Sequence, residues 1–176
     1  MNRYIYITIV VLIGGVAQAF AESLPLLPDH QLTPGVARTD LTLQKFCTTK
    51  WGKDARHVSA ADKKMVFSAY GLTGNKDPAC ITDAHGRHCE IDHLISRELG
   101  GADDVKNLWP QPYGSQPWNA VRKDCVETRL HKEVCAKQST MTLHEAQIAI
   151  KSDWTAVYLR FFEAPVAGEP CRSKKN

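Results

Sequence analysis

This 176-residue chain has six cysteines, all of which follow a segment with the pattern of an export signal. Together these two features limit the folds that the chain can adopt. Residues 1–21 contain Arg3, then an apolar run, then the small residues Ala19 and Ala21, which is the pattern of a cleaved signal peptide. The apolar run is shorter than the roughly 18 to 20 residues that a membrane-spanning helix needs, so we expect cleavage rather than a retained anchor. The sequence therefore predicts a periplasmic or secreted product without stable membrane association.

An even number of cysteines in an exported chain predicts disulfide bonds. The candidates are Cys47, Cys80, Cys89, Cys125, Cys135 and Cys171. Six cysteines allow about 15 pairings and the sequence does not choose among them, although Cys80 and Cys89 bracket one loop that a bridge between them would tie. A zinc site is less favoured, because the chain has no C-x-x-C or H-x-x-x-H pair.

The composition fits one globular domain and excludes a disordered chain, since 43% of the residues are hydrophobic and 23% are charged. Prolines and a glycine between the signal peptide and the first periodic segment predict an extended lead segment. We divide the chain into a signal peptide over 1–21, the lead segment over 22–44, one domain over 45–170 and a tail over 171–176.

Capping signals and apolar spacing predict three helices. The first spans residues 59–70, where Ser59 and Asp62 can cap it, and the second runs from 116 to about 136. The third follows a capping box formed by Thr142 and Glu145. The expected core stripes are Met65, Val66, Ala69 and Tyr70 on the first helix, Trp118, Val121, Cys125, Leu130 and Val134 on the second, and Ala146, Ile150, Trp154, Val157 and Phe161 on the third.

Two short strands are expected before the second helix. Residues 89–95 alternate in part between apolar and polar side chains, and residues 105–109 follow a turn at Gly100 and Gly101. The resulting order is strand, turn, strand, helix, which makes the fold a mixed α+β class.

The segment from Glu90 to Lys123 resembles the ββα-metal core of HNH endonucleases, and more narrowly a group of small exported bacterial HNH-like proteins. The resemblance is carried by Glu-Ile-Asp-His-Leu-Ile, Glu-Leu-Gly-Gly, Asn-Leu-Trp-Pro and Trp-Asn-Ala in this order. It implies a ββα-metal core with flanking helices, and an activity that hydrolyses phosphodiester bonds.

The resemblance also implies roles for individual residues. His93 matches the general base, Asn107 matches the asparagine that shapes the loop, and Asp92 and Asn119 match the metal ligands. A neutral imidazole takes a proton from water at neutral pH, and the oxygen donors favour a hard divalent ion. We therefore expect Mg²⁺ as the cofactor, with Mn²⁺ or Zn²⁺ as alternatives.

Asp92 and His93 are neighbours, so they would point to opposite faces of a regular strand. The strand must therefore end or twist at this point if both residues serve one site. On its own, the pair is more typical of a salt-bridged structural pair at the end of a strand.

Basic residues near the motif are candidates for contacts to the phosphate backbone. Lys123 follows Asn119 by one helical turn, and Arg97, Arg122 and Arg87 are further candidates. Acidic residues predominate over 89–120 and basic residues predominate in the segments on either side, an arrangement that suits a nucleic-acid partner.

We therefore expect an exported, metal-dependent endonuclease that cuts DNA, and less readily RNA, with low sequence specificity, and that is a monomer. The alternatives are a non-catalytic exported binding module on the same scaffold, and a nuclease toxin against competing cells. A toxin would have an immunity or inhibitor protein as its partner.

Overall fold

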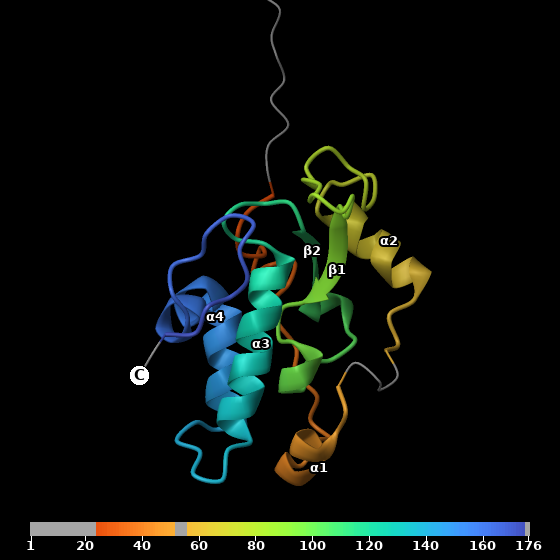
Figure 1. The fold of residues 1–176 in the computed structure, drawn as a ribbon. Coiled ribbons are helices and arrows are strands. Elements are labelled where there is room, and N and C mark those ends of the chain that lie inside the picture. Colours follow the sequence, from red (N-terminus) through yellow and green to blue (C-terminus); the bar gives the residue numbers. More distant parts are fainter. Residues whose placement is uncertain (1–23, 52–55, 175–176) are drawn as a thin grey trace, which may run out of the picture.

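The computed structural model describes residues 24–51 and 56–174, so the predicted signal peptide lies outside the described residues. The fold is mixed α+β, as predicted: α3 and α4 lie side by side, and α2 packs against a two-stranded sheet (Figure 1). The elements are α1 (Leu43–Thr48), α2 (Ala60–Ala69), β1 (Cys89–His93), β2 (Leu108–Pro112), α3 (Ala120–Val134) and α4 (Leu143–Phe161), with single 3₁₀ turns η1 (Arg97–Leu99) and η2 (Val105–Asn107). Among the described residues, no helix is both long and apolar enough to cross a membrane.

The sheet pairs β1 with β2 in antiparallel register, with Glu90 opposite Gln111 and Asp92 opposite Trp109. Directly opposed residues of an antiparallel pair have their side chains on the same face. One face of the sheet therefore carries these four residues.

The second strand begins three residues later than predicted and includes two prolines. Pro110 and Pro112 lack a backbone N–H, and they occupy alternate positions where that group would point away from β1. The expected start at Val105 is wrong, because η2 occupies that segment, where Asp104 accepts a hydrogen bond from the backbone N–H of Lys106.

Both predicted capping boxes are present. Ser59 and Asp62 cap α2, and Thr142 and Glu145 cap α4. α3 begins later than predicted, at Ala120, because the side chain of Asn119 accepts the N–H of Arg122 and caps the helix there.

The apolar stripes are correct in part. Met65 is 54% exposed, whereas the neighbouring Phe67 is buried, so α2 is rotated relative to the predicted stripe. On α3, Val121 is 39% exposed, and the buried face includes Arg122 and Lys123. The spacing of apolar residues does not assign charged residues to a core, so the sequence pattern could not predict that Arg122 and Lys123 are buried.

Two apolar clusters hold the elements together. The larger lies between α3 and α4 and also contains Phe46 of α1 and Leu99 of η1. The smaller joins α2 to the face of the sheet formed by Cys89, Ile91 and Leu108. The opposite face, with its polar residues, is turned toward α3.

All six cysteines form disulfides, as predicted: Cys47–Cys135, Cys80–Cys89 and Cys125–Cys171. The first bridge ties α1 to the end of α3, and the last ties the segment after α4 to the middle of α3. Three bridges fit a protein that resides in an oxidising compartment such as the periplasm or the extracellular space.

Candidate functional site

A hollow of about 340 Å³ lies beside β1 and α3, and we call it the acidic hollow. Three of the predicted site residues, Asp92, His93 and Arg97, line it. The lining residues are Trp51, Arg56, Glu90, Asp92, His93, Ser96, Arg97, Glu98, Asp124 and Glu127.

His93 is the last residue of β1 and is 3% exposed. Because the strand ends there, His93 and Asp92 line the same hollow although they are neighbours in sequence. The Nε2 atom of His93 lies 2.7 Å from Oδ1 of Asp103. An ionised carboxylate only accepts hydrogen bonds, so Nε2 carries the proton and Nδ1 has the free lone pair.

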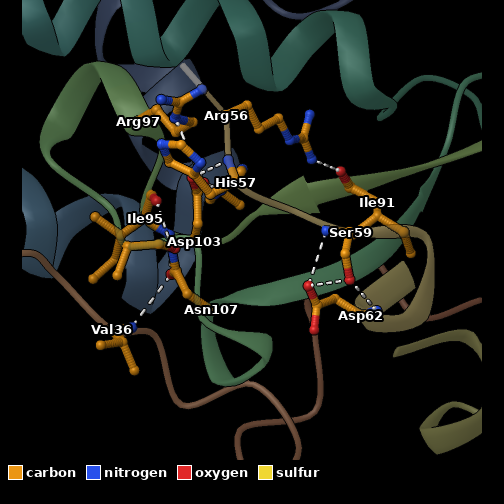
Figure 2. A network of polar contacts seen from close by, with 12 residues as sticks. Val36, Arg56, His57, Ser59, Asp62, Ile91, Ile95, Arg97, Asp103 and Asn107 are labelled. Atoms are coloured by element: carbon orange, nitrogen blue, oxygen red, sulfur yellow. Dashed lines mark hydrogen bonds and ion pairs between the residues drawn. The ribbon is translucent and has the colours of Figure 1, made fainter. Parts of the chain in front are cut away.

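Asp103 orients the imidazole and is itself held in place. Its other carboxylate oxygen accepts the backbone N–H of His57 at 2.6 Å, and Nε of Arg97 lies 3.6 Å from Oδ1 (Figure 2). Burial lowers the pKa of His93, although the carboxylates of Asp92 and Asp103 act in the opposite direction. The imidazole is therefore neutral at pH 7 and can accept a proton.

Lys123 of α3 is completely buried and contacts the end of β1. Its Nζ lies 2.7 Å from Oδ2 of Asp92, donates to the backbone carbonyl of His93 at 2.7 Å, and donates to the carboxylate of Glu127. Burial alone would lower the pKa of this ammonium, but the charges of Asp92 and Glu127 raise it. Lys123 therefore joins α3 to the strand, and its ammonium has no exposed surface for a phosphate oxygen.

Carboxyl groups crowd the rest of the acidic hollow. Burial and the charge of Asp92 raise the pKa of Glu90 to about 7, and the same two causes raise that of Asp124 to about 6. Burial also raises the pKa of Glu127 well above its ordinary value. The hydroxyl of Tyr113 donates to Glu90 at 2.6 Å. The hollow thus combines a neutral imidazole with several carboxyl groups that titrate close to neutral pH.

Asn107 shapes the backbone around the hollow. Its Oδ1 accepts the N–H groups of Ile95 and Val36, and its Nδ2 donates to the carbonyls of Ile95 and Ala102. Figure 2 shows Asn107 between Val36 and Ile95. The turn also requires Gly101, where a Cβ would lie 1.7 Å from the carbonyl oxygen of Ile95.

The structure does not bring the two predicted metal ligands together. Oδ1 of Asn119 accepts the N–H of Arg122 at 3.1 Å, and its side chain lines a different hollow from that of Asp92. Asp92 itself is paired with Lys123. Within residues 24–51 and 56–174, no three His, Cys, Asp or Glu side chains form a group that could hold a metal ion. The pair of Asp92 and Asn119 therefore does not fit a shared divalent ion.

The predicted arginine contacts are spread over the molecule. Arg97 lines the acidic hollow, whereas Arg122 is buried beside α4 and donates to the carbonyl of Val166 at 2.6 Å. Arg87 pairs with Asp83 and stacks on Tyr113. Only Arg97 of these three lies at the acidic hollow.

The sequence analysis missed the site carboxyl groups of Glu90, Asp124 and Glu127 and three further residues. Arg56 lines the hollow and donates to the carbonyl of Ile91 at 2.5 Å, Trp51 lies beside it, and Asp103 holds His93. Of these three further residues, the sequence offered an indication only for Asp103. It follows Gly101 in the turn, ten residues after His93. Arg56 and Trp51 come from a distant segment whose position depends on the tertiary fold.

No family model, curated protein or solved structure matches the chain. The chemistry of the site's own residues therefore has to indicate its function. It holds an oriented neutral imidazole, two guanidinium groups and a set of carboxyl groups around one hollow. The oriented imidazole beside the hollow suits general-base chemistry.

Proposed function

We propose that the chain is an exported endonuclease that hydrolyses phosphodiester bonds, in DNA more readily than in RNA, with His93 as its general base. The observation that carries the proposal is the hydrogen bond from His93 Nε2 to Asp103 at the end of β1. This bond leaves Nδ1 as the basic nitrogen beside a hollow that a substrate could enter. The order of two strands and a helix agrees with the resemblance to HNH endonucleases.

In the proposed step, Nδ1 of His93 takes a proton from a water molecule whose oxygen attacks the phosphorus. The bond between phosphorus and the leaving oxygen then breaks, and the leaving oxygen takes up a proton from a second water molecule. Arg56 and Arg97 line the same hollow and supply guanidinium donors suited to phosphate oxygens. Asp103 stabilises the imidazolium that forms, since a carboxylate beside Nε2 favours the charged ring.

The test measures nicking of supercoiled plasmid by the oxidised, exported protein and by His93→Ala. We expect His93→Ala to lower the rate at least about 100-fold, because general-base catalysis contributes on that scale. His88→Ala is the matched control: the side chain of His88 bonds to Thr82, outside the acidic hollow, and its removal should leave the rate unchanged. Near-ultraviolet circular dichroism checks that each variant is folded.

Two outcomes would overturn the proposal. If the folded wild type cuts neither plasmid nor RNA, a non-catalytic binding module becomes the better explanation of the scaffold. If His93→Ala cuts as fast as the wild type, the base is misassigned.

A divalent ion is a separate part of the proposal, because the ligand pair expected from the sequence does not meet. Parallel assays with Mg²⁺, Mn²⁺, Zn²⁺ and EDTA measure the requirement. Activity lost in EDTA and restored by Mg²⁺ would show that the reaction requires a divalent ion. Full activity in EDTA would exclude the metal-dependent form of the reaction.

A further inference from the structure

The proposed reaction leaves one accessible carboxyl group of the acidic hollow without a role, that of Asp124. This residue lies on the exposed side of α3 and lines the hollow together with His93. α3 packs beside η1, the 3₁₀ turn that follows β1 (Figure 1). The carboxyl group of Asp124 and the imidazole of His93 therefore reach the same hollow from two different elements.

The partners of the other carboxyl groups distinguish them from Asp124. Asp92 and Glu127 both contact the ammonium of Lys123, and Glu90 accepts a hydrogen bond from a tyrosine hydroxyl. Within the described residues, Asp124 has no hydrogen bond or ion pair through its side chain. Its carboxyl group is therefore available to a bound substrate.

Asp124 also lines a second hollow, of about 390 Å³, between α3 and the segment that follows α4. Thr128 and Lys132 are exposed, lie about one and two turns further along the helix, and line this second hollow. Hydroxyl and ammonium groups are donors for phosphate oxygens. Glu98, the remaining carboxyl group of the acidic hollow, does not line it. Asp124 thus lies between the hollow that contains the base and a surface suited to the next part of a polynucleotide.

The surroundings of Asp124 favour its protonated form near neutral pH. The surrounding protein excludes water from the carboxyl group, and this burial, together with the charge of Asp92, raises its pKa to about 6. Bulk water has a pKa of about 15.7, so this carboxyl group is a far stronger proton donor. The ionisable groups around it are Glu90 and Asp92 of β1, Glu98 of η1, Lys123 and Glu127 of α3, Arg87 before β1 and Tyr113 after β2.

We propose that Asp124 is the general acid of the reaction, an inference that rests on the proposed nuclease function. As the bond between phosphorus and the leaving oxygen breaks, the carboxyl group of Asp124 gives its proton to that oxygen and becomes a carboxylate. Asp124 thus takes the place of the second water molecule as the proton donor. Afterwards the imidazolium of His93 loses a proton to solvent and the carboxylate of Asp124 takes one up, so one water molecule is consumed for each bond that breaks.

The test compares two substrates that differ in their leaving group. Cleavage of supercoiled plasmid expels an alkoxide, a strong base that needs a proton, whereas bis(4-nitrophenyl) phosphate expels 4-nitrophenolate, a weak base that leaves without one. We expect Asp124→Asn to lower the rate on plasmid at least about 100-fold at pH 6, and the rate on bis(4-nitrophenyl) phosphate less than about threefold. His93→Ala should lower both rates, because the base acts on the attacking water in both reactions.

The pH dependence of plasmid cleavage provides a second readout. The rate of the wild type should fall more than about tenfold from pH 6 to pH 8, because the protonated form of Asp124 is lost as the pH rises through about 6. The amide in Asp124→Asn does not titrate, so the low rate of this variant should not fall over the same range.

Glu133→Gln is the matched control, because it replaces a carboxyl group by an amide on the same helix, outside the acidic hollow. It should leave both rates unchanged. Urea unfolding at pH 8 checks the fold of Asp124→Asn. We expect this variant to be at least as stable as the wild type, since it removes a charge that its burial and the charge of Asp92 disfavour.

The outcomes separate this inference from the proposed function. A folded wild type that cuts no plasmid at any pH would overturn the nuclease, and the general acid with it. Wild-type plasmid cleavage by Asp124→Asn, equal losses on the two substrates, or an unchanged fall between pH 6 and pH 8 in this variant would overturn the general acid alone. A loss confined to plasmid in Glu98→Gln, but not in Asp124→Asn, would assign the proton donor to Glu98 instead.

Discussion

Asn107→Ala is expected to lower the free energy of unfolding by more than about 4 kcal/mol, because its side chain makes four hydrogen bonds to backbone groups. The residue is completely buried, so water cannot replace the lost partners. The bonds join three separate segments, at Val36, Ile95 and Ala102. Their loss would release the loop between β1 and β2 together with the lead segment.

Urea unfolding of the oxidised variant and wild type measures this loss. Asn119→Ala is the matched control, because that asparagine makes a single capping bond and its removal should cost only about 1 kcal/mol. If Asn107→Ala lay within about 1 kcal/mol of the wild type, the four bonds would not be what holds the loop.

Lys123→Met is expected to cost about 3 to 5 kcal/mol of stability, since it leaves buried carboxylates without their cation. Methionine keeps much of the length of the lysine side chain, so the loss would come from charge rather than from a cavity. The effect should shrink when Glu127→Gln is added, because fewer negative charges then remain near Asp92. We expect a coupling of at least about 1 kcal/mol between the two positions.

A double-mutant cycle in urea provides that coupling. Arg129→Met is the control on the same helix: Arg129 pairs with Glu133 at the surface, where an ion pair contributes less than about 1 kcal/mol. Equal losses from Lys123→Met and Arg129→Met would show that Lys123 is not the electrostatic link between α3 and β1.

Local signals predicted α2, α3, α4 and the presence of disulfides, whereas α1 was not predicted. The capping boxes at Ser59 and Thr142 depend on side chains three residues apart, and both are formed as expected. The even cysteine count indicated disulfide bonds, and Cys80–Cys89, noted as a bridge that would tie one loop, is among the three that are formed. These features depend on neighbouring residues or on chemistry that needs no tertiary model.

The site was harder to predict, because it depends on which way charged residues face. Spacing on a helix gave Lys123 as a phosphate contact, whereas the side chain is buried against Asp92. Asn119 has the residue type of a ligand and also that of a helix cap, and the sequence does not decide between them. The positions of Arg56 and Asp103 depend on contacts between distant segments, which a linear motif does not contain.

The disulfides also order the assembly of the site in time. Two bridges reach α3, one through Cys125 within the helix and one through Cys135 at its end. Cys171, the partner of Cys125, follows it by 46 residues and lies beyond α4. The Cys47–Cys135 bridge can form before α4 is complete, whereas the Cys125–Cys171 bridge has to wait until the whole of α4 has been synthesised. Since α3 supplies Asp124 and Glu127 to the acidic hollow, a chain in a reducing compartment would lack the bridges that hold this helix in place.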